Sequence, residues 1–289
     1  MPMKIVFPVA GVGTRFLPAT KEVPKEILPV IDRPLIQYAV EEAVASGLSD
    51  FVFITAPGKE ALERYFAPNR PLDAFLRRQG KEKLLDDVRR FYRKRFAYIR
   101  QEQALGFGHA IALAEKAVGG RPFAIALPDD LILAGKPVLA QMLAVHRKYK
   151  APVLAFMKVP RAEAPRYGIG AGPFLEERVF SLEKLVEKPA PGKAPSNFAV
   201  IGRYIMTPDI FPLLQRARRG AGGEIQLTDA VVELMKRRRV LGYFFEGRRF
   251  DAGTTLGYVE TLLHVALLRR DTRDFTRRLL RSLARDEKP

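Results

Sequence analysis

A glycine-rich segment near the N-terminus carries the residue types that bind phosphate groups. Its glycines, Gly11 and Gly13, are followed by the cations Arg15 and Lys25. Glycine lets backbone N–H groups approach an anion closely, and nearby cations neutralise phosphate charge. The segment follows the apolar run 5–10, which predicts a buried first strand, and open α/β sheets bind ligands at the carboxyl ends of their strands. We therefore expect a nucleoside triphosphate at this loop.

Two well-known phosphate-binding loops do not fit this segment. The dinucleotide-binding fingerprint needs a third glycine three positions after the second, where this chain has Phe16. The P-loop needs Gly-Lys followed by Ser or Thr, and every Gly-Lys pair of the chain continues with Glu, Pro or Ala. Nicotinamide-dependent hydride transfer and P-loop NTPase activity are therefore not favoured.

Two adjacent carboxylates, Asp129 and Asp130, follow the apolar run 123–127. In a parallel sheet this places them at the same edge as the glycine loop. Mg²⁺ prefers carboxylate oxygens and keeps several waters, so one or two aspartates beside substrate phosphates are enough to hold it. Taken alone, either aspartate could equally cap the next turn.

The hydrophobic pattern predicts the sheet that holds these residues. Short apolar runs alternate with amphipathic segments, as is typical of a mostly parallel sheet flanked by helices. The expected strands are 5–10, 51–55, 96–99, 123–127 and 153–157, and the expected helices are 34–47, 108–118 and 138–149. Farther along, we expect strands at 179–187, 198–206 and 241–245 and helices at 228–239 and 256–270. The predicted fold class is α/β, a Rossmann-like, mixed and mostly parallel sheet flanked by helices, with a smaller second sheet and a C-terminal helical tail.

The domain organisation follows from the same pattern. Residues 1–265 are predicted to form a single catalytic domain, with a more polar insertion of small helices at about 68–95. Residues 266–289 are predicted to form a basic tail, in which apolar and arginine positions alternate from 267 to 283 as in an amphipathic helix. Such a helix either contacts a neighbouring subunit or lies solvated on its own subunit.

Composition narrows the class of protein. The chain has 289 residues, of which 47% are hydrophobic and 28% charged, as in a globular protein. The formal net charge of +17 comes from basic clusters interleaved with acids, which we interpret as solvated faces, so no nucleic-acid partner is expected. Neither a membrane-spanning run nor a signal peptide is recognisable, and no membrane partner is expected. The absence of cysteine excludes disulfides and thiolate metal sites and fits a cytoplasmic enzyme.

The glycine-rich segment is similar to the signature of the sugar nucleotidyltransferases, Gly-x-Gly-Thr-Arg-x-x-Pro-x-Thr followed by Pro-Lys-x-x-x-Pro. The matching residues are Gly11, Gly13, Thr14, Arg15, Pro18, Thr20, Pro24, Lys25 and Pro29. Within that family the run resembles the bacterial UTP–glucose-1-phosphate uridylyltransferases. The resemblance implies the nucleotide-diphospho-sugar transferase fold and Mg²⁺-dependent transfer of UMP from UTP to glucose 1-phosphate, forming UDP-glucose and pyrophosphate by direct in-line displacement.

Alternatives of three kinds stand beside this expectation. A glucose-1-phosphate thymidylyltransferase, or another sugar-1-phosphate nucleotidyltransferase, would share the first loop. The insertion at 68–95, the Leu-Pro-Asp-Asp run at 127–130 and the Gly-Glu-Ile-Gln-Leu-Thr-Asp run at 223–229 favour the uridylyl branch. A basic nucleic-acid-binding α/β protein and an unreactive paralogue that binds the sugar nucleotide are the rivals from other classes.

The resemblance also implies roles for individual residues. The catalytic residues would be Arg15, Lys25 and Lys188, and the Mg²⁺ ligands would be Asp129 and Asp251. The nucleotide would be bound by Ala10, Gly11, Gly13, Thr14, Glu26, Gln101 and Gly106, with Gln101 reading the uracil ring. The sugar would be bound by Asp130, Tyr167, Gly168, Glu187, Asn197, Val200 and Glu224. Related enzymes are homodimers or homotetramers.

Three further residues invite functional interpretations that we do not favour. His109 is expected in the first turn of a helix and not as a catalytic base. Thr228 and Asp229 are expected to cap a helix, because both residue types do so readily.

Overall fold

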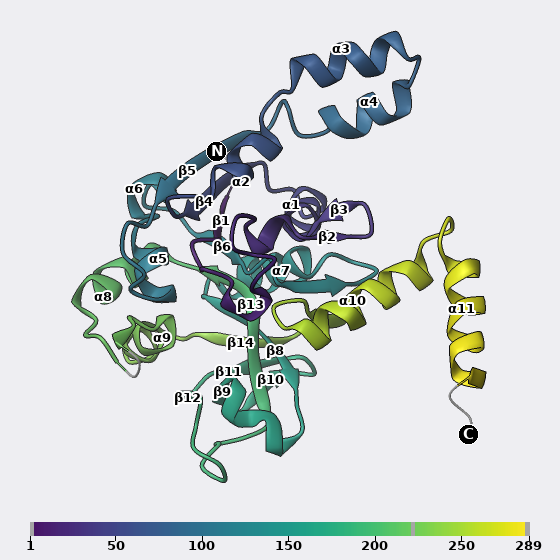
Figure 1. Cartoon of the computed structure of the whole chain (residues 1–289). Helices are drawn as coiled ribbons and strands as arrows, with labels where there is room; N and C mark the ends of the chain where they lie inside the picture. Colours follow the sequence, from purple (N-terminus) through teal and green to yellow (C-terminus); the bar gives the residue numbers. More distant parts are fainter. Residues whose placement is uncertain (1–2, 221–222, 287–289) are drawn as a thin grey trace.

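A mixed β-sheet runs through the molecule, and this confirms the α/β prediction. The computed structural model describes residues 3–220 and 223–286. The sheet has 11 strands, with the main order β10-β11-β14-β8-β13-β6-β1-β4-β5, and β9 and β12 extend it beside β13. The N-terminal strands β6, β1, β4 and β5 are mutually parallel, whereas β13 is antiparallel to both β6 and β8. Figure 1 shows β13 crossing the centre of the molecule.

The strands of this sheet are short. They are β1 (Lys4–Pro8), β4 (Asp50–Thr55), β5 (Arg95–Arg100), β6 (Phe123–Ala126), β8 (Val153–Lys158), β9 (Gly168–Ala171), β10 (Phe174–Glu176), β11 (Val179–Ser181), β12 (Lys184–Glu187), β13 (Phe198–Met206) and β14 (Leu241–Phe244). Two small sheets pair β2 (Pro29–Val30) with β3 (Arg33–Pro34) and β7 (Asp130–Leu133) with β15 (Arg248–Asp251).

Helices cover both faces of the sheet, which explains why the parallel strands β6, β1 and β4 are mostly apolar. In β1, Ile5 and Phe7 belong to one hydrophobic cluster and Val6 to another, on the opposite face. The first cluster packs under α1 (Leu35–Ala45) and α7 (Val138–Tyr149). The second packs under α5 (Phe107–Ala112), α8 (Phe211–Arg216) and α9 (Leu227–Met235). The remaining helices of this region are α2 (Glu60–Phe66) and α6 (Glu115–Val118).

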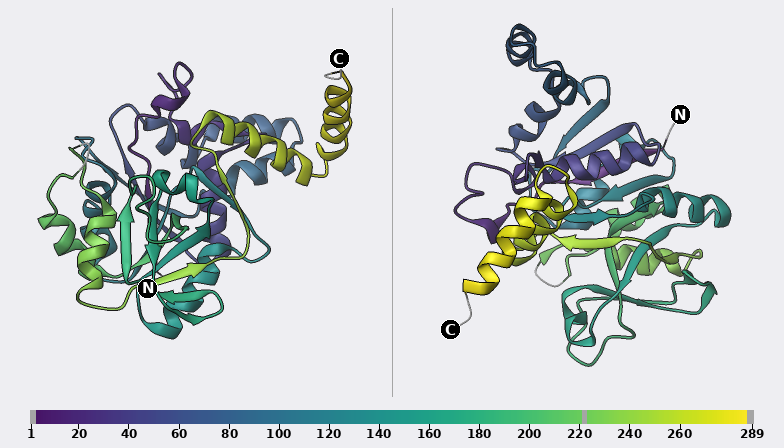
Figure 2. Two further views of the ribbon diagram at one scale, coloured as in Figure 1. Left: turned by 90° about the horizontal axis from the view of Figure 1, so that it is seen from below. Right: turned by 90° about the vertical axis from the view of Figure 1, so that its right-hand side faces the viewer.

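The predicted insertion is a helical hairpin made of α3 (Arg70–Arg78) and α4 (Glu82–Arg89). Figures 1 and 2 show it projecting from the body of the molecule at the β5 edge of the sheet. An ion pair between Arg89 Nε and Asp73 Oδ2, 2.9 Å apart, ties the two helices together.

The C-terminal tail differs from the prediction. Instead of one helix from 267 to 283, α10 (Thr255–Leu268) ends and α11 (Arg273–Asp286) begins after a turn. At the turn, Arg269 is extended and pairs with Asp271, two residues ahead, with Nη2 2.6 Å from Oδ2. Residues two apart do not face each other on a helix, so this pairing ends α10. The expected boundary at 265/266 therefore falls inside α10.

Two other segments are divided where continuous elements were predicted. The strand expected at 179–187 is β11 and β12, because the backbone between them bonds elsewhere, with Leu182 N donating to Val240 O at 2.9 Å. The helix expected at 108–118 is α5 followed by α6. No helix of the described ranges is long and apolar enough to cross a membrane.

Candidate active site

The glycine loop leaves the sheet at the carboxyl end of β1 and turns back at Gly13. Gly13 has φ +75°, a left-handed conformation that glycine adopts without strain. The Thr20 hydroxyl donates to the Gly13 carbonyl oxygen at 2.8 Å, which closes the loop. A Cβ at Gly13 would lie 3.3 Å from the Cβ of Lys25, so the glycine also lets the lysine segment pack against the loop.

Lys25 forms an ion pair with Asp129, with Nζ 2.6 Å from Oδ2. The pair exists because β1 and β6 are adjacent and parallel, so the loops that follow them meet at one edge. Burial alone lowers the pKa of the Lys25 ammonium, but the carboxylates of Asp129 and Glu26 outweigh it and raise the net pKa. Burial alone raises the pKa of Asp129, but Lys25 outweighs it and lowers the net pKa. Both partners are therefore charged at neutral pH.

Asp129 and Asp251 converge on Gly253, although they come from different strands. A Cβ at Gly253 would lie 2.8 Å from Asp129 Oδ2 and 3.2 Å from Asp251 Oδ1. Antiparallel pairing of β15 with β7 produces this approach, because it places Asp251 opposite Asp130, the residue after Asp129. Any larger residue at Gly253 would crowd both carboxylates.

The two carboxylates fit a hard cation. Within residues 3–220 and 223–286, no group of three or more His, Asp or Glu side chains is placed to hold a metal ion. Mg²⁺ does not need such a group, because one or two carboxylates suffice when substrate phosphates and water supply the other ligands. Asp129 and Asp251 are the residues that would hold it.

A cavity of about 540 Å³ opens beside these carboxylates. Nine of the predicted site residues line it, namely Arg15, Asp129, Asp130, Tyr167, Gly168, Glu187, Lys188, Val200 and Asp251. A Cβ at Gly168 would lie 3.1 Å from Glu187 Oε2, so glycine keeps this wall of the cavity open. Lys188 has φ +44°, an uncommon backbone conformation for a residue with a side chain and one often found at functional sites.

Arg249 contacts both residues expected to bind the sugar and one expected Mg²⁺ ligand. No role was predicted for it from the sequence. Its Nε donates to Asp130 Oδ1 at 2.6 Å, and its Nη2 lies 3.5 Å from Asp251 Oδ2. Nη1 donates to the Tyr167 hydroxyl at 3.3 Å. Burial lowers the pKa of Arg249, but Asp130 and Asp251 outweigh it, so the net pKa is raised and the guanidinium stays charged. Arg249 lies two residues before Asp251 in β15, so the two side chains lie on the same face of the strand. This spacing could have identified Arg249 as a site residue.

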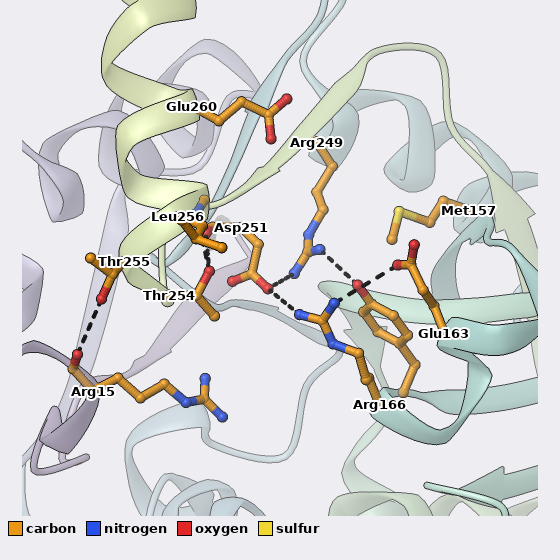
Figure 3. A pocket seen from close by; sticks show the side chains of 12 residues that line it. Arg15, Met157, Glu163, Arg166, Arg249, Asp251, Thr254, Thr255, Leu256 and Glu260 are labelled. Atoms are coloured by element: carbon orange, nitrogen blue, oxygen red, sulfur yellow. Dashed lines mark hydrogen bonds and ion pairs between the residues drawn. The ribbon is translucent and has the colours of Figure 1, made fainter. Parts of the chain in front are cut away.

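A second cavity, of about 740 Å³, adjoins the first. The two cavities share Arg15, Arg166, Tyr167, Arg249, Asp251 and Thr254. Figure 3 shows Arg249 and Arg166 both directed at Asp251, with Thr254 beside them at the start of α10. Arg166 Nη2 is 3.9 Å from Asp251 Oδ2. The carboxylate of Asp251 therefore lies between cations on one side and Asp129 on the other.

Some predicted site residues lie outside both cavities. These are Ala10, Gly11, Gly13, Thr14, Lys25, Glu26, Gln101, Gly106, Asn197 and Glu224. Lys25 adjoins the first cavity through Asp129, and the first four residues form the glycine loop. Asn197 donates from Nδ2 to Val159 O at 3.2 Å, and Glu224 Oε2 accepts from Gln226 Nε2 at 3.1 Å.

Glu26 is buried under the glycine loop. Its Oε2 is 3.0 Å from Lys59 Nζ, which also donates to Val9 O at 2.5 Å. Burial raises the pKa of Glu26, while Lys59 and Lys25 oppose the shift. In this arrangement Glu26 and Lys59 support the end of β1.

The prediction that Thr228 and Asp229 cap a helix is wrong. The residue before α9 is Gln226, and no side chain caps this helix end. The Thr228 hydroxyl instead donates to Glu187 Oε2 at 2.7 Å and lines the cavity. The other carboxylate oxygen, Glu187 Oε1, lies 3.9 Å from Lys188 Nζ, beyond hydrogen-bond distance. His109 lies in the first turn of α5, as predicted.

These features define a phosphate-handling enzyme site: a cationic glycine loop faces two converging carboxylates at the carboxyl edge of an α/β sheet, beside a polar cavity. A family model described as "Nucleotidyl transferase" matches residues 5–266, and the chain belongs to this family.

Three similar proteins are named for the same activity. One is the UTP–glucose-1-phosphate uridylyltransferase of Pseudomonas aeruginosa, 47% identical over 89% of this chain and 93% of that protein. Another is a crystal structure of UDP-glucose pyrophosphorylase complexed with UDP-glucose, 43% identical, with a TM-score of 0.87 over 93% of this chain and all of that one. A third is a UTP-bound UDP-glucose pyrophosphorylase (UGPase) from Acinetobacter baumannii, 36% identical, with a TM-score of 0.89 over 97% of this chain and 99% of that one.

Proposed function

We propose that this protein transfers UMP from UTP to glucose 1-phosphate, releasing pyrophosphate and forming UDP-glucose, with Mg²⁺ as cofactor. The observation that carries the proposal is the convergence of Asp129 and Asp251 on Gly253, with Lys25 2.6 Å from Asp129. Cations for a triphosphate and carboxylates for a hard cation thus meet beside a cavity lined by Glu187 and Tyr167. Relatives at 43% and 47% identity with this activity support the choice of substrates.

The proposed reaction needs no general base. A phosphate oxygen of glucose 1-phosphate, already anionic at neutral pH, bonds to the α-phosphorus of UTP. The bond from that phosphorus to the bridging oxygen breaks, and its electron pair leaves on pyrophosphate. The obstacle is repulsion between two polyanions, so positioning and charge neutralisation supply the catalysis.

Each cation has a separate task in this scheme. Arg15 holds the β- and γ-phosphates that leave as pyrophosphate, Lys25 lies beside the reacting phosphorus, and Lys188 steers the incoming phosphate. Mg²⁺, when bound by Asp129 and Asp251, supplies further neutralisation of the triphosphate.

The sugar half of the cavity is suited to hydroxyl groups. Carboxylates only accept hydrogen bonds, so Glu187 and Asp130 can each take the donors of a sugar ring. Asp130 is already bound by Gly202 N at 2.6 Å and by Arg249, which fixes its position before the sugar arrives. Tyr167, Gly168 and Val200 also line this cavity.

The proposal is tested by incubating the purified protein with UTP, glucose 1-phosphate and MgCl₂. We expect equal amounts of pyrophosphate and UDP-glucose, and loss of both when EDTA replaces the metal. Product formation that persists in EDTA would rule out the metal assignments of Asp129 and Asp251 while leaving the transfer itself in place.

Arg249→Met is expected to raise the KM for glucose 1-phosphate about tenfold or more. A hydrogen bond to a charged group contributes about 1.5–3 kcal/mol, and the variant would leave the buried Asp130 with one partner fewer. Arg249→Lys should recover only part of the loss, because an ammonium cannot hold both aspartates in the same fork. Arg248→Met is the matched control, because Arg248 is exposed and pairs with Glu260 on α10. An unchanged KM in Arg249→Met would remove this role.

We further propose that the protein acts in the cytoplasm as a homodimer or homotetramer. On α11, Phe275, Leu279 and Leu283 recur every four residues and are 64%, 43% and 52% exposed. An apolar stripe of this kind is suited to burial against another subunit. Figure 1 shows α11 leaving the body of the molecule at the end of α10.

Deletion of residues 270–289 is expected to lower the mass of the assembly, measured by light scattering after size-exclusion chromatography. The full-length protein serves as the control at equal concentration. An assembly of unchanged subunit number would show that the tail is not the contact.

A further inference from the structure

Gln101, the residue expected to read the base, is held in one orientation by its surroundings. It follows β5 and is 7% exposed, and its backbone N–H donates to Thr55 O at 2.7 Å. Its side-chain nitrogen Nε2 lies 3.3 Å from the Gly106 carbonyl oxygen and 2.8 Å from Nδ1 of His109.

The Gly106 carbonyl oxygen shows which end of the Gln101 amide, the NH₂ or the oxygen, faces inward. A carbonyl oxygen can only accept, so the amide group beside it must be the NH₂ and not the oxygen. Nε2 has two N–H groups, and the second is directed to His109. His109 Nδ1 must therefore accept, which places the proton of the neutral imidazole on Nε2.

The position of Gly106 is itself fixed by close packing. Gly106 has φ +94°, and a Cβ there would lie 2.7 Å from Glu224 Cβ. Backbone hydrogen bonds of 2.8 Å from Ile225 N to Leu105 O and from Gly108 N to Ile225 O hold the loop on both sides. The carbonyl that orients Gln101 is therefore part of a rigid turn.

These contacts leave Gln101 with one free function, its carbonyl oxygen Oε1. No hydrogen bond to Oε1 is present within residues 3–220 and 223–286. Oε1 is not fully buried, because Thr55 Oγ1 is the one fully buried side-chain polar atom without a hydrogen-bond partner in those ranges. An incoming donor could therefore pair with Gln101 Oε1.

We propose that His109 is a specificity-determining positioning residue, which keeps Gln101 an acceptor and so selects bases that carry an N–H at ring position 3. Uracil and thymine present that N–H, whereas cytosine presents a bare ring nitrogen there and would face Oε1 with another acceptor. The inference rests on the proposed function, in which this loop binds the base of UTP. Sites built around one hydrogen bond reject the mismatched partner strongly, because a buried polar group is left unpaired.

The test compares UTP with CTP in variants at position 109. His109→Leu removes the shorter of the two contacts that hold the NH₂ inward and leaves only the 3.3 Å hydrogen bond to the Gly106 carbonyl oxygen. Gln101 can then turn its NH₂ outward more readily, so the ratio of kcat/KM for UTP over CTP should fall at least about tenfold. His109→Asn keeps an acceptor oxygen near the place of Nδ1 and should retain most of the preference. The ratio for UTP over dTTP should not change, because both bases carry the same N–H. His264→Leu, on α10, is the control for loss of a histidine.

Equal losses for UTP and CTP in His109→Leu would show a merely structural role and overturn the inference. A second measurement needs no variant: in calorimetric titration, UDP should bind the wild-type protein at least about tenfold more tightly than CDP. Equal binding of UDP and CDP would also overturn it. If UTP and glucose 1-phosphate instead give no pyrophosphate, the proposed function fails, and the calorimetric comparison still decides whether Gln101 acts as an acceptor.

Discussion

Lys25→Met is expected to lower kcat for pyrophosphate release by about 100-fold or more. The lysine side chain is 22% exposed, and its ammonium is 2.6 Å from Asp129 at the edge where the triphosphate would bind. Removing one preorganised group that stabilises charge in a transition state costs about 10²–10³ in kcat. Methionine keeps the length and the apolar stem of the side chain, so the variant removes the charge with little change in packing.

Lys236→Met is the matched control for this variant. Lys236 forms an ion pair of the same length, 2.6 Å, with Glu233, but on an exposed surface, so it removes one positive charge without touching the cavity. Steady-state kinetics of both variants, with thermal unfolding to confirm folding, would make the comparison. An unchanged kcat in Lys25→Met would exclude Lys25 from the mechanism.

Asp251→Asn is expected to raise the Mg²⁺ concentration needed for half-maximal activity about tenfold or more, and additional Mg²⁺ should restore part of the activity. The substitution keeps one oxygen near Gly253 but removes the negative charge that a hard cation prefers. Arg166 and Arg249 would then face an amide, so their attraction to position 251 would also weaken.

The measurement is a Mg²⁺ titration at saturating UTP and glucose 1-phosphate. Asp86→Asn is a suitable control, because Asp86 is an exposed aspartate on α4 and lines neither cavity. A loss of activity that no Mg²⁺ concentration relieves, with an unchanged metal requirement, would place Asp251 in another role.

The sheet was predictable because its strands are buried on both faces and read as short apolar runs. In β1 the pattern needs no knowledge of neighbours, since Ile5, Val6 and Phe7 are all buried. The break between α10 and α11 lies in the polar run 269–274, close to the end of the helix expected at 256–270, but the amphipathic helix expected from 267 to 283 ran across it. It depends on the pairing of Arg269 with Asp271, and Asp32 also contacts Arg269 from far away in the sequence.

The residues of the candidate site also fall into those that the sequence predicts and those that it does not. Motifs of fixed spacing made Arg15, Lys25, Asp129 and Asp251 candidates, because each motif carries its own local geometry. Arg249 acts through partners that include the distant Asp130 and Tyr167. It was missed because no motif assigned it a role, although it lies two residues before Asp251 in the same strand.

The contacts of Thr228 and His109 could not be predicted from local sequence either, because they depend on how the chain folds. The Thr228 hydroxyl finds Glu187 across 41 positions, and cap chemistry was the simpler local explanation. His109 is only eight positions from Gln101, yet their contact depends on how the intervening loop folds back on itself at Gly106.

The most direct test of the central claim is pyrophosphate release with glucose 1-phosphate and a panel of UTP, dTTP, ATP, CTP and GTP. We expect pyrophosphate release that depends on glucose 1-phosphate, with the highest kcat/KM of the panel for UTP and with UDP-glucose as the second product. Release that is fastest with dTTP would place the protein among the thymidylyltransferases. No release with any nucleotide would contradict the assignment of this site as a sugar nucleotidyltransferase.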